Sequence, residues 1–148
     1  VVADNAGSVV TLAAQPGRRY TFSAVDLPGL DAAGEDAAAL RTSFAVKPGD
    51  PVVAQNVIDA GVALRVALGR LGFALAEIGE QEIVVDHQSA TAQLVLPVRT
   101  GSYQRFGRLR VSGDPPLGAD HVQRIARWQP GERFRQDRVD DLRRALLA

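Results

Sequence analysis

The chain has 148 residues, of which 46% are hydrophobic, and its 17 basic residues balance its 17 acidic ones. This composition is typical of a folded globular chain and not of a disordered one. Cysteine is absent, which excludes disulfides, thiol catalysis and thiolate metal sites, and no stretch approaches the ~18–20 apolar residues of a membrane-spanning helix.

Charge is divided unevenly along the chain. Residues 1–98 carry 6 basic and 11 acidic residues, whereas residues 99–148 carry 11 arginines and 6 acidic residues. The basic second half can attract anionic partners or lipid headgroups. A solvated basic face is the plainer interpretation.

The first long strand is predicted over residues 19–27, which are rich in aromatic and β-branched residues and end at a Pro-Gly turn. In a regular strand, its aromatic residues would point to one face of the sheet and its later aliphatic residues to the other. We therefore expect a bulge near Ser23 and Ala24 that turns both sets toward one core.

Two helices are predicted next. Residues 35–46 carry apolar side chains at helical spacing, and a longer stripe recurs at steps of three and four over residues 53–71. For the second helix we expect Asp50 as the N-cap, Pro51 as the first helical residue and Gly72 at the C-terminal end.

Two strands are predicted to close the unit. The first is expected over the extended residues 73–78 and 82–85, with a break at Gly79, and is followed by a turn at residues 87–89. The second is expected over residues 92–98, where apolar side chains occupy alternate positions. The order strand, helix, helix, strand, strand predicts an α+β layer, in which two helices cover one face of a small three-stranded sheet.

The pattern repeats along the chain. Lys47-Pro48-Gly49-Asp50 has an echo 82 residues later at Gln129-Pro130-Gly131-Glu132, and residues 17–22 return as residues 101–106. Such spacing predicts tandem structural units. We expect the closing hairpin of an upstream unit at residues 1–17, a complete unit at 18–101 (the first repeat) and half of a downstream unit at 102–148 (the second repeat).

The second repeat is expected to contain a strand, a helix near Val122, the Pro-Gly turn and another helix, without the last two strands of a complete unit. The chain starts without an initiator methionine and stops inside an apolar-periodic run. We therefore expect it to be a piece of a longer protein.

The order of these motifs resembles the POTRA (polypeptide-transport-associated) family. The resemblance rests on the strand pattern from Tyr20 to Gly29, a short helix, the Pro-Gly-Asp/Glu turn, a longer helix ending at Leu71-Gly72-Phe73, and a closing hairpin. Residues 103–113 and 122–134 are most similar to TamA-like members, and the BamA branch matches less well.

This resemblance implies tandem POTRA units, one complete and two partial, at the periplasmic face of the outer membrane of a Gram-negative bacterium. It implies a scaffold that binds unfolded outer-membrane proteins or autotransporters and docks a TamB-like accessory protein. A C-terminal β-barrel, absent from this sequence, would complete the parent. The role requires no catalysis, cofactor, metal ion or nucleic acid.

A sheet edge offers unpaired backbone N–H and C=O groups, to which an extended client strand can add. We place this candidate docking strand at Glu82, Ile83, Val84, Val85 and Asp86, with the acidic residues at its ends as gatekeepers against uncontrolled pairing. The alternative is an ordinary hairpin arm whose edge is covered.

Arginines gather near the predicted unit boundaries at Arg18, Arg19, Arg105, Arg108 and Arg110. We expect Arg18, Arg19, Arg105 and Arg108 to set the angles between neighbouring units through ion pairs. The alternative is scattered surface charge, worth only ~0–1 kcal/mol per exposed pair.

Residues for other chemistry are sparse. The two histidines, His87 and His121, are isolated and lack the ligand spacing of a metal site. The hydroxyl residues lack a matching His and acid constellation, and there is no phosphate-binding loop. A second function class stays open: a small α+β binding domain whose Arg-rich C-terminal half takes an anionic ligand or a nucleic acid.

Overall fold

The computed structural model describes residues 2–3, 9–10, 17–113 and 118–147. At the N-terminal end, β1 (Val2–Ala3) pairs antiparallel with β2 (Val9–Val10). The remaining residues of the predicted upstream hairpin lie outside the described residues.

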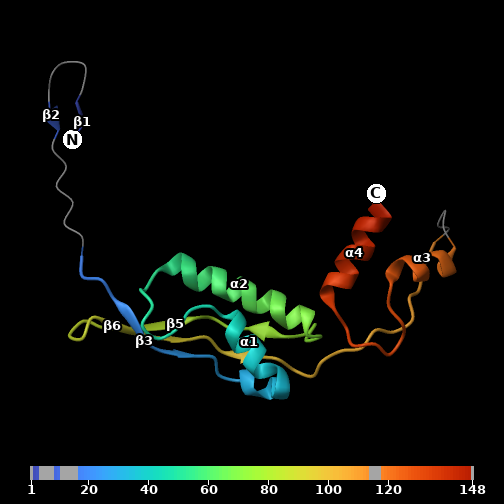
Figure 1. Cartoon of the computed structure of the whole chain (residues 1–148), viewed down its shortest axis with the longest axis horizontal. Coiled ribbons are helices and arrows are strands. Elements are labelled where there is room, and N and C mark those ends of the chain that lie inside the picture. The colour runs from blue at the N-terminus through green and yellow to red at the C-terminus, as the bar shows by residue number, and fades with distance from the viewer. Residues whose placement is uncertain (1, 4–8, 11–16, 114–117, 148) are drawn as a thin grey trace.

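A three-stranded sheet is the centre of the first repeat (Figure 1). It consists of β3 (Thr21–Asp26), β5 (Glu82–Asp86) and β6 (Thr91–Val95), in the order β3-β6-β5. The central strand β6 runs parallel to β3 and antiparallel to β5. The register of β3 shifts between Phe22 and Ala24, which confirms the predicted bulge.

Helices cover one face of this sheet. The helix predicted over residues 35–46 is shorter in the structure, as α1 (Ala37–Ser43). A 3₁₀ segment, η1 (Leu30–Asp36), precedes it and contains Gly34 in a non-helical conformation. The longer helix, α2 (Ala54–Arg70), lies along the sheet (Figure 1).

The core of the first repeat lies between the helices and the sheet. Leu40 of α1, Leu64 of α2 and Leu94 of β6 are fully buried. The alternation predicted for residues 92–98 is confirmed, because its four apolar positions are all buried: Ala92, Leu94, Leu96 and Val98.

Gly72 ends α2 as expected. Its φ is +95°, and the Phe73 N–H donates to the Leu68 carbonyl oxygen at 2.9 Å. This left-handed closure satisfies a carbonyl group of the last helical turn and is easiest for glycine.

The predicted start of this helix is wrong. Helix α2 begins at Ala54, Val53 precedes it, and the Asp50 carboxylate instead accepts the Lys47 N–H at 2.9 Å across the Pro-Gly turn. Pro51 forms a bridge with Thr21 of β3. Pairing with a distant strand therefore overrides the local capping preference.

Residues 49–52 form what we call the first strap, which runs beside β3. Gly49 N–H donates to the Phe22 carbonyl at 2.7 Å, Phe22 N–H donates to the Asp50 carbonyl at 2.9 Å, and Val52 N–H donates to the Tyr20 carbonyl at 2.9 Å. These three bonds cover the first half of the outer edge of β3.

A second small sheet adjoins the core. Strand β4 (Glu77–Ile78) pairs antiparallel with β7 (Val98–Arg99), and the Gly79 N–H donates to the Pro97 carbonyl at 2.8 Å. This pairing anchors the chain on the approach to β5.

The second repeat contains α3 (Ala119–Ala126) and α4 (Gln136–Leu147), with a hydrophobic cluster of its own. Phe106 stacks on Trp128, with ring centroids 4.4 Å apart and planes 10° apart. The buried members of this cluster are Phe106, Val122, Ala126, Trp128 and Leu142.

The hydrogen bonds of the first strap recur here. Gly131 N–H donates to the Phe106 carbonyl at 2.7 Å, Phe106 N–H donates to the Glu132 carbonyl at 2.8 Å, and Phe134 N–H donates to the Gln104 carbonyl at 2.8 Å. Residues 131–134 are therefore a second strap, so the sequence echo corresponds to a repeated backbone arrangement.

The strand expected after residue 102 does not form within the described residues. Only an isolated bridge joins Arg105 to Arg133. In the first repeat β3 pairs with β6, whereas no strand within the described residues of the second repeat offers such a partner. A strand requires a partner strand for its ladder of hydrogen bonds.

Candidate functional site

Strand β5 is an edge of the three-stranded sheet. One side pairs with β6 from Glu82 opposite Val95 to Asp86 opposite Thr91, and no strand of the described chain pairs with the other side. The residues predicted for docking, Glu82 to Asp86, are thus the same five that form β5. The edge is available, and its binding of another chain stays a prediction.

The side chains of β5 divide between the two faces of the sheet. Ile83 and Val85 lie opposite buried residues of β6, and Ile83 packs against the core. Val84 lies on the other face opposite Gln93 and is 54% exposed. An incoming strand would therefore meet apolar side chains on both faces.

The two edges of the sheet differ. The first strap hydrogen-bonds along the first half of β3, whereas β5 has no equivalent neighbour among the residues that the structure describes. An uncovered edge strand is a template for pairing with another chain.

A groove flanks the approach to β5. It has a volume of about 390 Å³ and lies between α2 and residues 78–81. Its lining includes Ile58 and Val62 of α2, which are 52% and 59% exposed, and Ile78 of β4. An apolar stripe on α2 therefore lies beside the sheet edge.

The turn at the far end of β5 is held by hydrogen bonds. The Asp86 carboxylate accepts the Gln88 N–H at 2.8 Å and the Ser89 hydroxyl at 2.7 Å. These donors, the Ser89 hydroxyl foremost, lower the pKa of Asp86 below its usual value because they stabilise the charged carboxylate. Asp86 therefore shapes the hairpin as well as placing charge at the edge.

Arg18 lies at this hairpin and not at the contact between the two repeats. Its guanidinium donates to the His87 carbonyl at 2.9 Å, and the Tyr20 hydroxyl lies 2.8 Å from His87 Nδ1. Arg19 is exposed and lines a hollow with its two neighbours in the chain. The upstream residues 11–16 lie outside the described part, so a junction role for this pair stays a prediction.

Within residues 17–113 and 118–147, no salt bridge joins Arg105 or Arg108 to the first repeat. Arg105 donates to the Gly131 carbonyl at 2.8 Å and so reinforces the second strap. Arg108 is exposed. The four predicted junction arginines therefore do not converge on one site.

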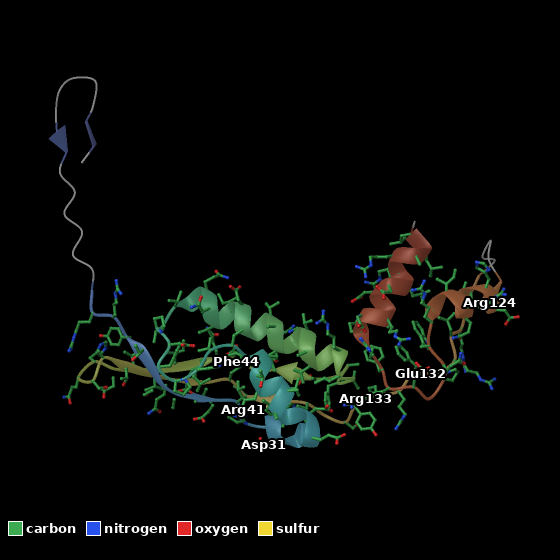
Figure 2. The ribbon with its side chains drawn as sticks, in the orientation of Figure 1. Asp31, Arg41, Phe44, Arg124, Glu132 and Arg133 are labelled. Atoms are coloured by element: carbon green, nitrogen blue, oxygen red, sulfur yellow. The ribbon has the colours of Figure 1, made fainter. Side chains whose placement is uncertain are left out.

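Arg133 makes an ion pair between the repeats, and the sequence analysis did not predict it. Its guanidinium bonds to the Asp36 carboxylate and lies over the rings of Phe73, at 5.7 Å, and Tyr103, at 4.6 Å. Figure 2 shows Arg133 where the sheet-bearing part of the chain meets the segment with α3 and α4. Cation–π contacts of this kind add to the attraction of the ion pair.

The backbone at this junction is also tightly packed. Gln104 N–H donates to the Gly72 carbonyl at 2.7 Å, and a Cβ added at Gly72 would lie 3.0 Å from the Phe134 carbonyl oxygen. Arg133 directly follows the Pro-Gly-Glu turn, at the position that Pro51 occupies after the Pro-Gly-Asp turn of the first repeat. This difference between the two echoes is the sequence signal that could have indicated a separate role for Arg133.

The described residues offer little for other chemistry. Among residues 17–113 and 118–147, no group of three or more histidine, aspartate or glutamate residues is arranged to hold a metal ion. Within the same ranges, no helix combines the length and the apolar character needed to cross a membrane.

At the level of sequence, no protein-family profile and no curated protein matches the chain. Solved structures share its fold. POTRA domains 3–5 of BamA from Haemophilus influenzae align with a TM-score of 0.66 at 20% identity, over 86% of this chain and 49% of that one. BamA from Haemophilus ducreyi lacking POTRA domains 1–3 gives 0.65 at 18% identity, over 86% and 24%.

The chain therefore has the fold of POTRA domains, which confirms the predicted α+β class. It spans about half the length of the Haemophilus influenzae structure that it matches.

Proposed function

We propose that this chain is a periplasmic scaffold segment of an outer-membrane β-barrel assembly or translocation factor, and that it binds client polypeptides transiently along β5. The uncovered edge of β5, in a chain with the POTRA fold, is the observation that carries this proposal. Residues 102–148 would continue the array toward the rest of the parent.

Addition of a strand suits a factor with many clients. Backbone N–H and C=O groups pair without regard to client side chains. Each added hydrogen bond contributes on the order of 0.5–1.5 kcal/mol net, and ordering the client offsets part of this gain. The result is weak, reversible capture.

The groove beside β5 adds affinity for apolar side chains. A client strand next to β5 projects alternate side chains to the two faces of the sheet. Those on the helical side would meet Ile58, Val62 and Ile78, which line the groove. Extended segments with apolar residues at every second position, as in barrel strands, fit this arrangement.

The clients in this proposal are unfolded outer-membrane proteins or autotransporters. The accessory partner is a TamB-like protein, and the closer relationship is to TamA-like members of the superfamily. The chain performs no bond-breaking chemistry and serves as a docking and positioning arm.

A pair of matched labels tests the docking strand. The native chain has no cysteine, so a photo-crosslinker can be attached at Val84→Cys or at Gln93→Cys. Val84 and Gln93 are cross-strand partners on one face, the first at the edge and the second in the centre of the sheet. Strands lie ~4.8 Å apart, so a client strand at β5 would be one spacing from residue 84 and two from residue 93.

We expect crosslinks to an unfolded barrel strand from position 84, with few from position 93. Backbone amide shifts on titration should concentrate in residues 82–86. Equal crosslinking from both positions, or shifts confined to other residues, would refute docking at β5.

A further inference from the structure

A basic groove lies between α3 and α4 of the second repeat. Its volume is about 540 Å³. Three arginines contribute to its lining: Arg124 from α3, Arg127 from the end of α3, and Arg138 from α4. Figure 2 shows Arg124 on α3, at the end of the molecule away from α1.

These three charges are not neutralised by the fold. The Arg138 guanidinium donates to the backbone carbonyl of Arg127, which carries no net charge. The carboxylate in the lining, Asp141, is already paired with Arg144. Within residues 17–113 and 118–147, no salt bridge joins Arg124, Arg127 or Arg138 to an acidic group.

The fold does not require these arginines. In the first repeat, 82 residues earlier, the same positions are Thr42, Ala45 and Asn56. His121, which also lines the groove, corresponds to Ala39. One copy of the pattern therefore has a neutral surface where the other concentrates positive charge, which points to a role beyond packing.

The groove also has apolar lining residues. Ile125, Ala126 and Ala145 line it together with the charged side chains. A flat bilayer surface cannot enter a concave site, and a free phosphate ion would leave the apolar residues uncovered. A peptide that alternates acidic and apolar side chains can satisfy both the arginines and the apolar residues.

We propose that the α3–α4 groove is a docking site for a short acidic, amphipathic segment of a partner protein. Its carboxylates bind Arg124, Arg127 and Arg138, and its apolar side chains cover Ile125 and Ala145. The site does not depend on client capture at β5, because the groove and β5 share no residue.

A fluorescent peptide that alternates glutamate with leucine is the probe, and its glutamine analogue is the uncharged control. The groove variant is Arg124→Gln/Arg127→Gln/Arg138→Gln. The control variant, Arg108→Gln/Arg110→Gln/Arg143→Gln, removes the same charge from exposed positions outside the groove. Fluorescence anisotropy measures Kd.

We expect Kd to rise about tenfold or more in the groove variant and to change less than about twofold in the control variant. Raising the salt concentration should weaken binding, and the glutamine peptide should bind at least about tenfold more weakly. Arg124→Gln alone should raise Kd about threefold. Arg124 is exposed and makes no salt bridge within residues 17–113 and 118–147, so the melting temperature should stay unchanged.

Equal loss of binding in the two triple variants would refute the site, because net charge alone would then explain the attraction. Tighter binding to phosphatidylglycerol vesicles or to single-stranded DNA than to the acidic peptide, with the same dependence on the groove arginines, would also overturn the proposed partner. Crosslinking at β5 reports on the other proposal separately.

Discussion

The two repeats share a strap and differ in what the strap supports. In both, a Pro-Gly turn leads into an extended segment that makes the same three backbone hydrogen bonds to an aromatic-containing stretch before it. In the first repeat that stretch is β3, part of a sheet, whereas in the second it makes only an isolated bridge. The strap is therefore a local module, and the strand depends on partners distant in the sequence.

The same contrast appears in the helices. Leu64 of α2 is 0% exposed, while Leu146, at the matching position of α4, is 47% exposed. Both belong to a helical apolar stripe, but among the residues that the structure describes α2 has a sheet to pack on and α4 has none. Amphipathic periodicity therefore marks a face that can be buried, and tertiary structure determines whether it is.

The largest expected effect is at this pair of leucines. Leu64→Ala removes fully buried atoms and should cost about 3 kcal/mol or more of the free energy of unfolding, whereas Leu146→Ala should cost less than about 1 kcal/mol. Urea unfolding followed by far-UV circular dichroism measures both. Equal costs would mean that α4 is packed as tightly as α2, contrary to the comparison.

The aromatic cluster of the second repeat should come next. Phe106→Ala removes the ring that stacks on Trp128 and should destabilise this region by about 2 kcal/mol, below the ~3–5 kcal/mol usual for such changes because the cluster is small and can relax. Trp128 is the only tryptophan, so its fluorescence reports this cluster directly.

Phe106→Leu serves as the control, since it keeps an apolar side chain and loses only the aromatic contact, at about 1 kcal/mol. An emission maximum unchanged in both variants would show that Trp128 does not rely on this ring.

The junction between the repeats should show a smaller, specific coupling. A double-mutant cycle with Arg133→Gln and Asp36→Asn is expected to give about 1 kcal/mol, because both side chains are partly buried. The control is the exposed pair Arg41 and Asp31 (Figure 2), expected at less than about 0.5 kcal/mol. Similar coupling in both cycles would contradict a special role for Arg133.

The smallest effect concerns the β5–β6 hairpin of the first repeat. Removing the hydroxyl donor with Ser89→Ala should move the pKa of Asp86 upward, toward its ordinary value of 3.8. A carboxylate whose folded pKa is lowered contributes stability that is complete above the unfolded pKa and is lost as the pH falls through the folded pKa. In the variant, the stability that Asp86 contributes should therefore change less as the pH falls.

Carbon-13 NMR titration of the Asp86 carboxyl measures this shift. Asp137 in the second repeat is the internal reference, because its pKa is lowered chiefly by Arg135 and should not respond to the substitution. A shift of both carboxyls would indicate a global change and not a local hydrogen bond.

Several elements were predictable because their causes are local. The bulge in β3 followed from a change of apolar parity within one strand, and the end of α2 followed from Gly72 at the end of a helical stripe. The five predicted docking residues coincide with β5. Their location at a sheet edge, however, depends on the strand order, which local patterns do not specify.

The errors share a different cause. Asp50 and Pro51 favour a helix start by composition, yet β3 lies close enough to pair with this segment and holds it extended. The sequence analysis also missed Arg133, which pairs with Asp36 of the first repeat from the second strap and not from the predicted boundary. Proximity in sequence is a poor guide to which long side chains meet.

By itself, the sequence determined the repeated pattern, the turns, the helical stripes and the α+β class, because these depend on backbone preferences and on periodicity within short windows. Only the tertiary structure decided which strand lies at a sheet edge, which leucines are buried, and which arginines line a groove or form an ion pair. Those outcomes depend on contacts between segments that lie tens of residues apart in the sequence. Such contacts form only when the whole fold places the segments side by side.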